Sequence, residues 1–347
     1  MSPKKPARPR ATQVAATKAV VRWYLEQHFR RPSDPGVVEM FCEPSRVGSF
    51  SVERHALRAG EGRALFRLLV ATAMFQRRQD VQILRILQGM GASDAAEISD
   101  ATRLLALVDE GNCAHMRSTQ SLAEACDLDK DPTTRMGCCN ANPGVGCHLK
   151  RHTVLLKRYG HFGKVPTSIA LMVRESGAQD LASLHRLVLE RERDPLARAQ
   201  ALESELSRAW RVSQKIASMF LSMVTNPDLS RGLAPWSQGI DWSYYVVIDS
   251  NVDLFLASIG YKGTGTYDAR RDFVRDLARG IDLTEFDSDL QSYNPRLVQQ
   301  AMYLFMSIAN RRAAEADCMH LAPIPCATCP SAVRRRCPAR PALPASQ

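Results

Sequence analysis

The sequence predicts an all-α protein, and three observations lead to this expectation. Apolar residues recur at three- and four-residue steps over most of the 347-residue chain, for example at Val212, Ile216 and Phe220. Strand-like alternation is scarce, and the best run, 244–248, is short and ends at Asp249. No apolar run approaches the length of a membrane span. We therefore expect helices joined by loops, with 244–248 serving as a connector into a helix.

The composition favours a polyanionic partner. The chain carries 46 Lys and Arg against 36 Asp and Glu, a net charge of +10 that suits nucleic acid or an anionic membrane surface. The start MSPKKPARPR is basic but has no apolar core, so we expect no signal peptide. These features predict a cytoplasmic, nucleoid-associated protein, or a nuclear one in a eukaryote. Thiols stay reduced there, so ten cysteines indicate metal ligands more than disulfides.

In chain order, the helical pattern falls into two lobes between two tails. Residues 1–12 and 338–347 read as solvated tails, because they are rich in Pro and Arg or in small residues. We expect 55–235 to form one helical lobe. Residues 13–54 and 236–337 are expected to combine into the second lobe.

Two stretches interrupt the helical pattern and are expected to be loops. The first, 111–147, contains five cysteines, and the second, 225–243, is rich in Gly, Pro and Asn. The five cysteines and two nearby histidines raise the idea of a second metal site, although their irregular spacing favours free buried thiols. These residues are Cys113, Cys126, Cys138, Cys139, Cys147, His115 and His148.

Four cysteines near the C-terminus predict a metal site. Cys318, Cys326, Cys329 and Cys337 follow the spacing C-x7-C-x2-C-x7-C after the last strongly periodic helix. Four thiolates on a short loop can hold a 4Fe–4S cluster or a tetrahedral zinc ion. The close C-x2-C pair and the prolines after Cys329 and Cys337 favour the cluster, while His320 inside the loop keeps zinc open as the alternative.

Three consecutive arginines lie between the last two of these cysteines. A small metal-held loop would display Arg334, Arg335 and Arg336 on the surface, where they suit contact with phosphate groups. An ordinary solvated loop end explains the same charges.

Four segments together resemble one protein family. Residues 64–90, with Gln76, look like a helix pair of the helix-hairpin-helix, endonuclease III-like DNA glycosylases. The segment 148–173 contains GKVPTS and is similar to the turn before the hairpin of that family. AWRVSQKIA at 209–217 stands where the family has its hairpin and lysine, and VVIDSNVDLFLASIGY at 246–261 where it has its catalytic aspartate.

The resemblance implies a two-lobed helix-hairpin-helix glycosylase fold, in which 55–235 is the barrel lobe and the second lobe carries the iron–sulfur loop. It also implies Lys215 and Asp249 as the catalytic pair. A carboxylate can stabilise the cation that forms as an N-glycosidic bond breaks, and a desolvated amine can form a Schiff base with the sugar. Without the resemblance, Asp249 reads as a helix N-cap and Lys215 as a surface lysine. Asp253 and Asp241 are the alternative acids.

The same resemblance assigns the DNA contacts. Gln76 stands at the position of a minor-groove glutamine, and a polar helix end is its other interpretation. Arg211 and Ser213 replace the two hairpin glycines, which puts a tight turn in question, although Arg211 could supply charge instead. The implied partner is double-stranded DNA containing a damaged or modified base, bound by a monomer away from membranes.

Other residues could extend this interface. The basic stretch 148–164 could line a phosphate track, or be a solvated helix face. Four aromatic side chains before Asp249 could stack a flipped base, or pack in the core; they are Trp236, Trp242, Tyr244 and Tyr245.

Three functions follow from these expectations. The first is a base-excision glycosylase with AP lyase activity. The second is a glycosylase without the lyase step, in which water replaces Lys215. The third is a non-catalytic, metal-stabilised regulatory DNA-binding protein, in which Lys215 and Asp249 are structural.

Overall fold

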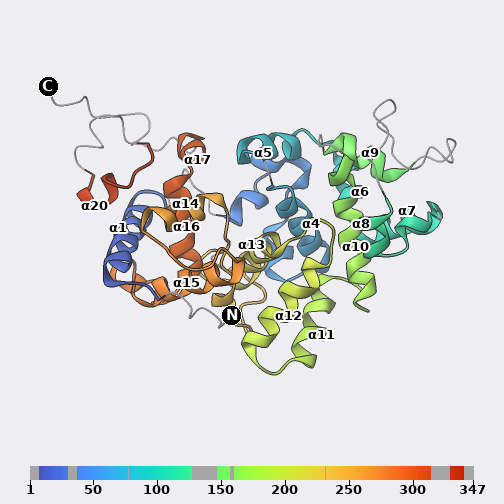
Figure 1. Ribbon diagram of the computed structural model, residues 1–347. Coiled ribbons are helices and arrows are strands. Elements are labelled where there is room, and N and C mark those ends of the chain that lie inside the picture. Colours follow the sequence, from blue (N-terminus) through green and yellow to red (C-terminus); the bar gives the residue numbers. More distant parts are fainter. Residues whose placement is uncertain are drawn as a thin grey trace. The chain divides into compact units, whose positions relative to one another are not determined.

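The computed structural model describes residues 8–29, 37–76, 78–111, 113–126, 147–156, 160–230, 232–313 and 329–339. All regular secondary structure in these ranges is helical, which confirms the all-α expectation (Figure 1). No helix within them is both long and apolar enough to cross a membrane. The chain forms two compact units. Unit 1 combines Met1–Gly36 with Ser243–Gln347, and unit 2 is Val37–Trp242.

Unit 2 consists of short helices. In chain order they are η1 (Glu39–Cys42), α2 (Pro44–Val47), η2 (Gly48–Phe50), α3 (Arg54–Arg58), α4 (Gly62–Ala73), α5 (Asp80–Gln88), α6 (Ala92–Ile98), α7 (Ala101–Gly111), η3 (Ala114–Met116), α8 (Thr119–Glu124), α9 (His148–Leu155), η5 (Gly160–Lys164), α10 (Val165–Glu175), α11 (Leu181–Arg191), α12 (Pro195–Ser207) and α13 (Gln214–Thr225).

Helices α4, α10 and α13 form the centre of unit 2. Every residue from Ala64 to Ala73 is buried except Arg67, and all of 165–173 is buried. Helices this apolar on all sides are expected in the middle of a core. Helix α4 accordingly packs against α10, α11 and α13.

Residues 37–54 belong to unit 2, although we expected them in the other lobe. Helices α2 and η2 pack against α5, and the ring of Phe41 lies 5.6 Å from that of Phe75. Gly48 has φ +57°, and a Cβ atom there would lie 2.6 Å from the carbonyl oxygen of Gln88. This close backbone approach cannot be read from the local pattern, which is why the expected boundary was misplaced.

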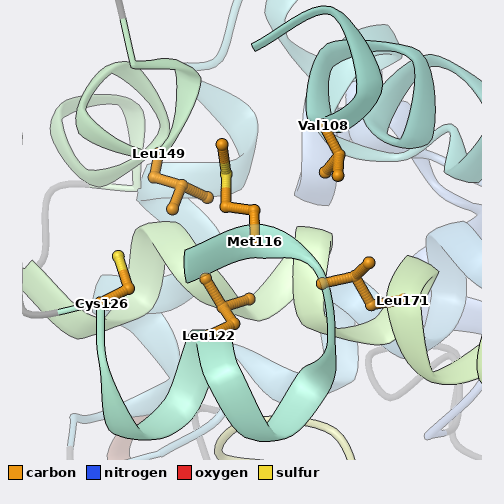
Figure 2. Packing of buried hydrophobic residues seen from close by; sticks show 6 residues of the cluster. All are labelled: Val108, Met116, Leu122, Cys126, Leu149 and Leu171. Atoms are coloured by element: carbon orange, nitrogen blue, oxygen red, sulfur yellow. The ribbon is translucent and has the colours of Figure 1, made fainter. Parts of the chain in front are cut away.

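A smaller hydrophobic cluster occupies another part of unit 2 (Figure 2). Its buried members are Val108, Met116, Leu122, Cys126, Leu149 and Leu171. They come from α7, η3, α8, α9, α10 and the residue before the undescribed segment 127–146. The expectation of a loop throughout 111–147 is therefore wrong for η3 and α8, which form because Met116 and Leu122 are buried and Ser118 caps α8.

Unit 1 is built from both ends of the described chain. Its helices are α1 (Ala11–Gln27), α14 (Ser250–Ser258), α15 (Tyr267–Arg279), η7 (Leu283–Glu285), α16 (Pro295–Met306), α17 (Ile308–Ala313) and α20 (Ser331–Arg334), and η6 (Trp242–Tyr244) lies at the boundary with unit 2. Helix α16 is central and contacts α1, α14 and α15. The expected tail 1–12 is too long, because α1 already begins at Ala11. Gln13 attaches this helix to α14 by donating a 3.1 Å hydrogen bond from Nε2 to the carbonyl of Ile259.

Of the strand-like run 244–248, Tyr244 ends η6, and 245–248 is a buried connector into α14 that forms no ladder with described residues. The hydroxyl of Tyr267 donates to the carbonyl of Val246 at 2.9 Å. This bond fixes the chain just before Asp249, where α14 begins.

Candidate functional site

Helices α12 and α13 form a hairpin, with a tight turn at 208–213 between them. The N–H of Val212 donates to the carbonyl of Ala209 at 3.0 Å. Arg211 has φ +64° and is the only non-glycine residue of the described chain with positive φ. This left-handed conformation is the one that glycine usually adopts. The tight turn is therefore present, with an arginine where the resemblance predicts glycine.

The N-terminus of α13 presents positive potential beside this turn. Ser213 occupies the N-cap position, but its side chain makes no capping hydrogen bond. Within the described chain, the N–H groups of Lys215 and Ile216 have no acceptor. The open N–H groups of a first helical turn carry partial positive charge and favour anions.

Two cationic side chains add to this potential. Arg211 and Lys215 are both half-buried, and neither forms an ion pair or hydrogen bond with a described residue. The guanidinium of Arg211 lies 5.5 Å from the ring centre of Trp210. The turn thus combines two uncompensated cations with open backbone donors.

Gln76 connects this turn to the core of unit 2. Its Nε2 donates to the carbonyl of Ala73 at 2.7 Å and to the carbonyl of Arg211 at 3.0 Å. The structure therefore brings Gln76 to the hairpin that carries Arg211, Ser213 and Lys215. The sequence did not reveal this structural role, because it depends on an acceptor far along the chain.

Trp210 fixes the other side of the turn. Its N–H donates to Ser168 Oγ at 2.6 Å, and its ring lies 4.7 Å from Lys164 Nζ. Lys164 is only 1% exposed, and its Nζ donates to the carbonyl of Leu122 at 3.0 Å. Lys164 is therefore a structural residue and does not belong to a phosphate track.

The rest of the basic stretch 148–164 is mostly neutralised where it is described. His152 is fully buried, with Nε2 2.8 Å from Glu97 Oε1, and Arg151 forms an ion pair with the same carboxylate. Burial lowers the pKa of His148 to about 4, and its Nε2 lies 3.1 Å from Thr167 Oγ1. The burial of His152 and the pairing of Arg151 with Glu97 do not favour a phosphate track at these residues.

Asp249, in unit 1, caps α14. Its Oδ1 accepts a 2.9 Å hydrogen bond from the N–H of Val252, while Oδ2 accepts none from a described residue. The side chain is half-buried. A helix N-terminus favours the ionised form of such a carboxylate.

A buried arginine lies in the electrostatic range of Asp249. Arg296 on α16 is 3% exposed, and its Nη1 donates to Gln299 and Gln300. Burial lowers the pKa of Arg296 to about 10, against the opposing effects of nearby tyrosines and Asp249. The sequence analysis missed this residue, although an arginine inside an otherwise apolar helix start was the available signal.

Both candidate catalytic residues thus lie at a helix N-terminus, Lys215 in α13 and Asp249 before α14. Comparisons with family models, curated proteins and solved structures found no match.

The alternative acids have other partners. Both oxygens of Asp253 lie 2.6 Å from Nη1 of Arg270, which compensates the carboxylate. The N–H of Asp241 donates to the carbonyl of Pro195 at 3.0 Å, and Asp241 belongs to unit 2. The Asp249 carboxylate keeps an open oxygen within the described chain, whereas that of Asp253 is paired with Arg270.

Three of the four aromatic side chains proposed for a pocket pack in the cores. Trp236 is buried and stacks on His185, with ring centres 4.4 Å apart. Tyr244 and Tyr245 are buried in unit 1, where the guanidinium of Arg271 lies 4.0 Å from the Tyr244 ring. Their surroundings favour the core interpretation over a wall for a flipped base.

The C-terminal cysteine loop is described only in part. Cys318 and Cys326 lie outside the described residues, whereas Cys329 and Cys337 are both half-buried. Within the described ranges, no group of three or more His, Cys, Asp or Glu side chains is placed to hold a metal. Of the cysteines of the proposed second site, Cys126 is a buried member of the small cluster in Figure 2. Cys113 and Cys147 pack against that cluster, and 138 and 139 are not described.

The three loop arginines differ in their surroundings. Arg334 and Arg335 are exposed, as expected for contact with phosphate groups. Arg336 is half-buried, and its Nη1 donates to the carbonyl of Ala332 at 3.1 Å. The first two are therefore the better candidates for a nucleic-acid contact.

Proposed function

We propose that the protein is a DNA base-excision glycosylase with AP lyase activity, acting as a monomer on double-stranded DNA that contains a damaged or modified base. The observation that carries this proposal is the α12–α13 hairpin. Its left-handed turn, its open N–H groups and the uncompensated guanidinium of Arg211 suit a DNA phosphate. The net charge of +10 favours the same partner.

In this proposal Asp249 stabilises the cation that develops on the sugar as the glycosidic bond breaks. Its carboxylate stands at the N-terminus of α14, and the open Oδ2 is the oxygen that would face the sugar. The bonding electrons leave with the base.

Lys215 supplies the second step of the proposed reaction. Once Nζ has given up a proton, its lone pair forms a bond to C1′, and the nitrogen loses a further proton to the departing base. Ring opening, with a proton from water taken up at O4′, then gives a protonated Schiff base. Loss of a C2′ proton then expels the 3′ phosphate. Lys215 has no carboxylate partner among the described residues, which leaves Nζ available to the sugar.

The proposal includes a 4Fe–4S cluster held by Cys318, Cys326, Cys329 and Cys337, with zinc as the alternative. Four thiolates suit either group, and the Sγ of Cys337 faces a buried guanidinium. When bound, the metal would shape the loop that displays Arg334 and Arg335.

The lyase step is tested by Lys215→Ala. We expect the borohydride-trapped complex and β-elimination to disappear on a panel of lesion-containing duplexes, while DNA binding persists. Lys262→Ala, a substitution of an exposed lysine in unit 1, serves as the matched control. Trapping that survives in Lys215→Ala would contradict the assignment, and base release without any trapping in the wild type would favour the glycosylase without lyase activity.

The glycosylase step is tested by Asp249→Asn and Asp249→Ser, which keep a side-chain oxygen for capping but remove the charge. Base release should fall about 100-fold or more, with little change in thermal stability. Thr266→Ala removes the cap of α15 in the same unit and should cost about 1 kcal/mol of stability without slowing chemistry. A loss of less than about tenfold in both Asp249 variants would reduce Asp249 to a capping role. A wild type that binds DNA but releases no base would favour the regulatory function.

A further inference from the structure

A buried lysine of unit 2 lies where α10 begins. Lys164 is the N-cap residue of α10 and is 1% exposed. The residue before it, Gly163, approaches α9 so closely that a Cβ atom there would overlap the carbonyl oxygen of Leu149. The backbone of Lys164 is therefore held by α9 on one side and by the buried start of α10 on the other.

The side chain of Lys164 reaches α8. Its Nζ donates to the carbonyl of Leu122 at 3.0 Å, and Leu122 is a member of the small hydrophobic cluster (Figure 2). Carbonyl groups in the last turn of a helix carry partial negative charge, so the end of α8 suits an ammonium group. A buried amine needs such a partner, because its removal from water is costly.

The same Nζ also contacts the turn of the α12–α13 hairpin. It lies 4.7 Å from the ring centre of Trp210, within the range of a cation–π attraction. Four residues after Lys164, the Oγ of Ser168 accepts the N–H of Trp210 at 2.6 Å. Residues four apart lie on the same face of a helix, so one face of α10 holds both the ring and the backbone of Trp210.

Trp210 in turn contacts the cation that the hairpin offers to a phosphate. Arg211 follows it in the chain, and its guanidinium lies 5.5 Å from the ring centre of Trp210. An arginine loses side-chain freedom when it binds a phosphate, and a contact that already restricts its guanidinium reduces this cost. The contacts thus run from α8 through Lys164 and Trp210 to Arg211.

We propose that Lys164 is a positioning residue of the DNA-binding turn: it holds Trp210 in place, and Trp210 directs Arg211 toward a DNA phosphate. Lys164 is buried and acts only through Trp210. The inference rests on the proposed function for its ligand, which is duplex DNA.

The test compares DNA binding by full-length wild type and Lys164→Met, which keeps an unbranched side chain but removes the charge and the N–H donors. Affinity for an undamaged duplex oligonucleotide should fall about threefold to tenfold, as for other coupled neighbours. In an Arg211→Gly background the same substitution should cost less than about twofold, because the side chain that Lys164 positions is gone. An equal loss in both backgrounds would overturn the inference, since a merely structural role would not depend on Arg211.

Arg67→Met is the matched control. Arg67 is a half-buried cation of α4 that donates to the carbonyl of Ser51 and to Ser99 Oγ, both at 2.9 Å. Its replacement therefore removes one positive charge and a bond to a backbone carbonyl, as Lys164→Met does. Its DNA affinity should equal that of the wild type, while circular dichroism verifies that the variants are folded. A loss as large as that in Lys164→Met would overturn the inference, because reduced charge or stability would explain both.

A second measurement follows the turn in the absence of DNA. Amide hydrogen exchange at 209–213 should accelerate in Lys164→Met and stay unchanged in Arg67→Met. If Lys164→Met does not fold, Trp210→Leu replaces it: this variant should lose DNA affinity to a similar extent, and the loss should likewise disappear in the Arg211→Gly background. Unchanged exchange and unchanged affinity in Lys164→Met would overturn the role of Lys164 and leave the proposed function standing. A wild type that does not bind duplex DNA would overturn both.

Discussion

At the scale of single residues, Arg211 combines a left-handed backbone conformation with a guanidinium that could bind a phosphate group. A left-handed conformation costs a residue with a Cβ atom about 1 kcal/mol relative to glycine. The turn nevertheless holds an arginine whose guanidinium has no hydrogen-bond acceptor among the described residues. Such a local cost is commonly found at binding sites.

Arg211→Gly should therefore separate stability from binding. We expect the free energy of unfolding to stay the same or rise by up to about 1 kcal/mol, because glycine adopts φ +64° without strain. Affinity for duplex DNA should fall, and the slope of log affinity against log salt should flatten by about 0.9, as for one lost phosphate contact. Arg208→Gln, which removes an arginine already paired with Glu175 and Glu205, is the control. DNA affinity equal to wild type at low salt would contradict the phosphate contact.

His185 makes the stability of unit 2 depend on pH. Burial, together with the charge of Arg198, lowers its pKa to about 4, whereas an unfolded histidine has a pKa of about 6.5. Between these values the unfolded chain binds a proton that the folded chain does not. This group therefore stabilises the fold above about pH 6.5, and its contribution falls by about 1.4 kcal/mol per unit as the pH drops toward 4.

His185→Phe keeps a ring against Trp236 but removes this titration. In urea denaturation, the stability of the wild type relative to His185→Phe should decrease steadily from pH 7 to pH 5. His55→Gln, a change at an exposed histidine, should show no such trend. A parallel pH dependence of wild type and His185→Phe would mean that folding does not lower the pKa of His185.

At the scale of elements, the sequence predicts those helices whose apolar residues repeat locally. Helices α4, α13 and α16 follow from such repeats, since their buried faces recur at three- and four-residue steps. Helix α8 does not, because its burial depends on Leu149 and Leu171, which lie far along the chain. Long-range packing also decides that 37–54 joins unit 2.

The same distinction applies to the candidate site. Lys215 and Asp249 were proposed from short segments that resemble a family, and their positions at helix N-termini follow local rules. Arg296 was missed because an arginine in an apolar helix start is a weak signal until its distant neighbours are known. The buried state of Lys164 likewise requires Trp210 and Leu122.

The hairpin should loosen when its link to α4 is removed. Gln76→Ala loses both hydrogen bonds of Nε2, to Ala73 and to Arg211, with an expected cost of about 1–2 kcal/mol. Amide hydrogen exchange should accelerate at 209–216. Gln88→Ala, which loses an exposed bond to the carbonyl of Ser45, is the control. Unchanged exchange at the turn would show that Trp210 alone fixes it.

At the scale of the whole molecule, the excess positive charge predicts salt-dependent binding to duplex DNA. Exchanging the exposed Arg334 and Arg335 for Gln should flatten the slope of log affinity against log salt by up to about 1.8, if both contact phosphates. Arg336→Gln should change it less, because this side chain bonds Ala332. Equal slopes for the double variant and the wild type would show that the cysteine loop does not contact DNA.

The order of the units along the chain also affects how the protein folds during translation. Helix α1 packs against α16, yet all of unit 2 is synthesised between them. At about 5–20 residues per second, α1 leaves the ribosome on the order of tens of seconds before its partner exists. Unit 2 can fold in that interval, whereas Val20, Val21 and Trp23 remain without the core that buries them in the native protein. During translation, α1 thus waits for α16 before its apolar face is covered, and that face meanwhile suits binding by a chaperone.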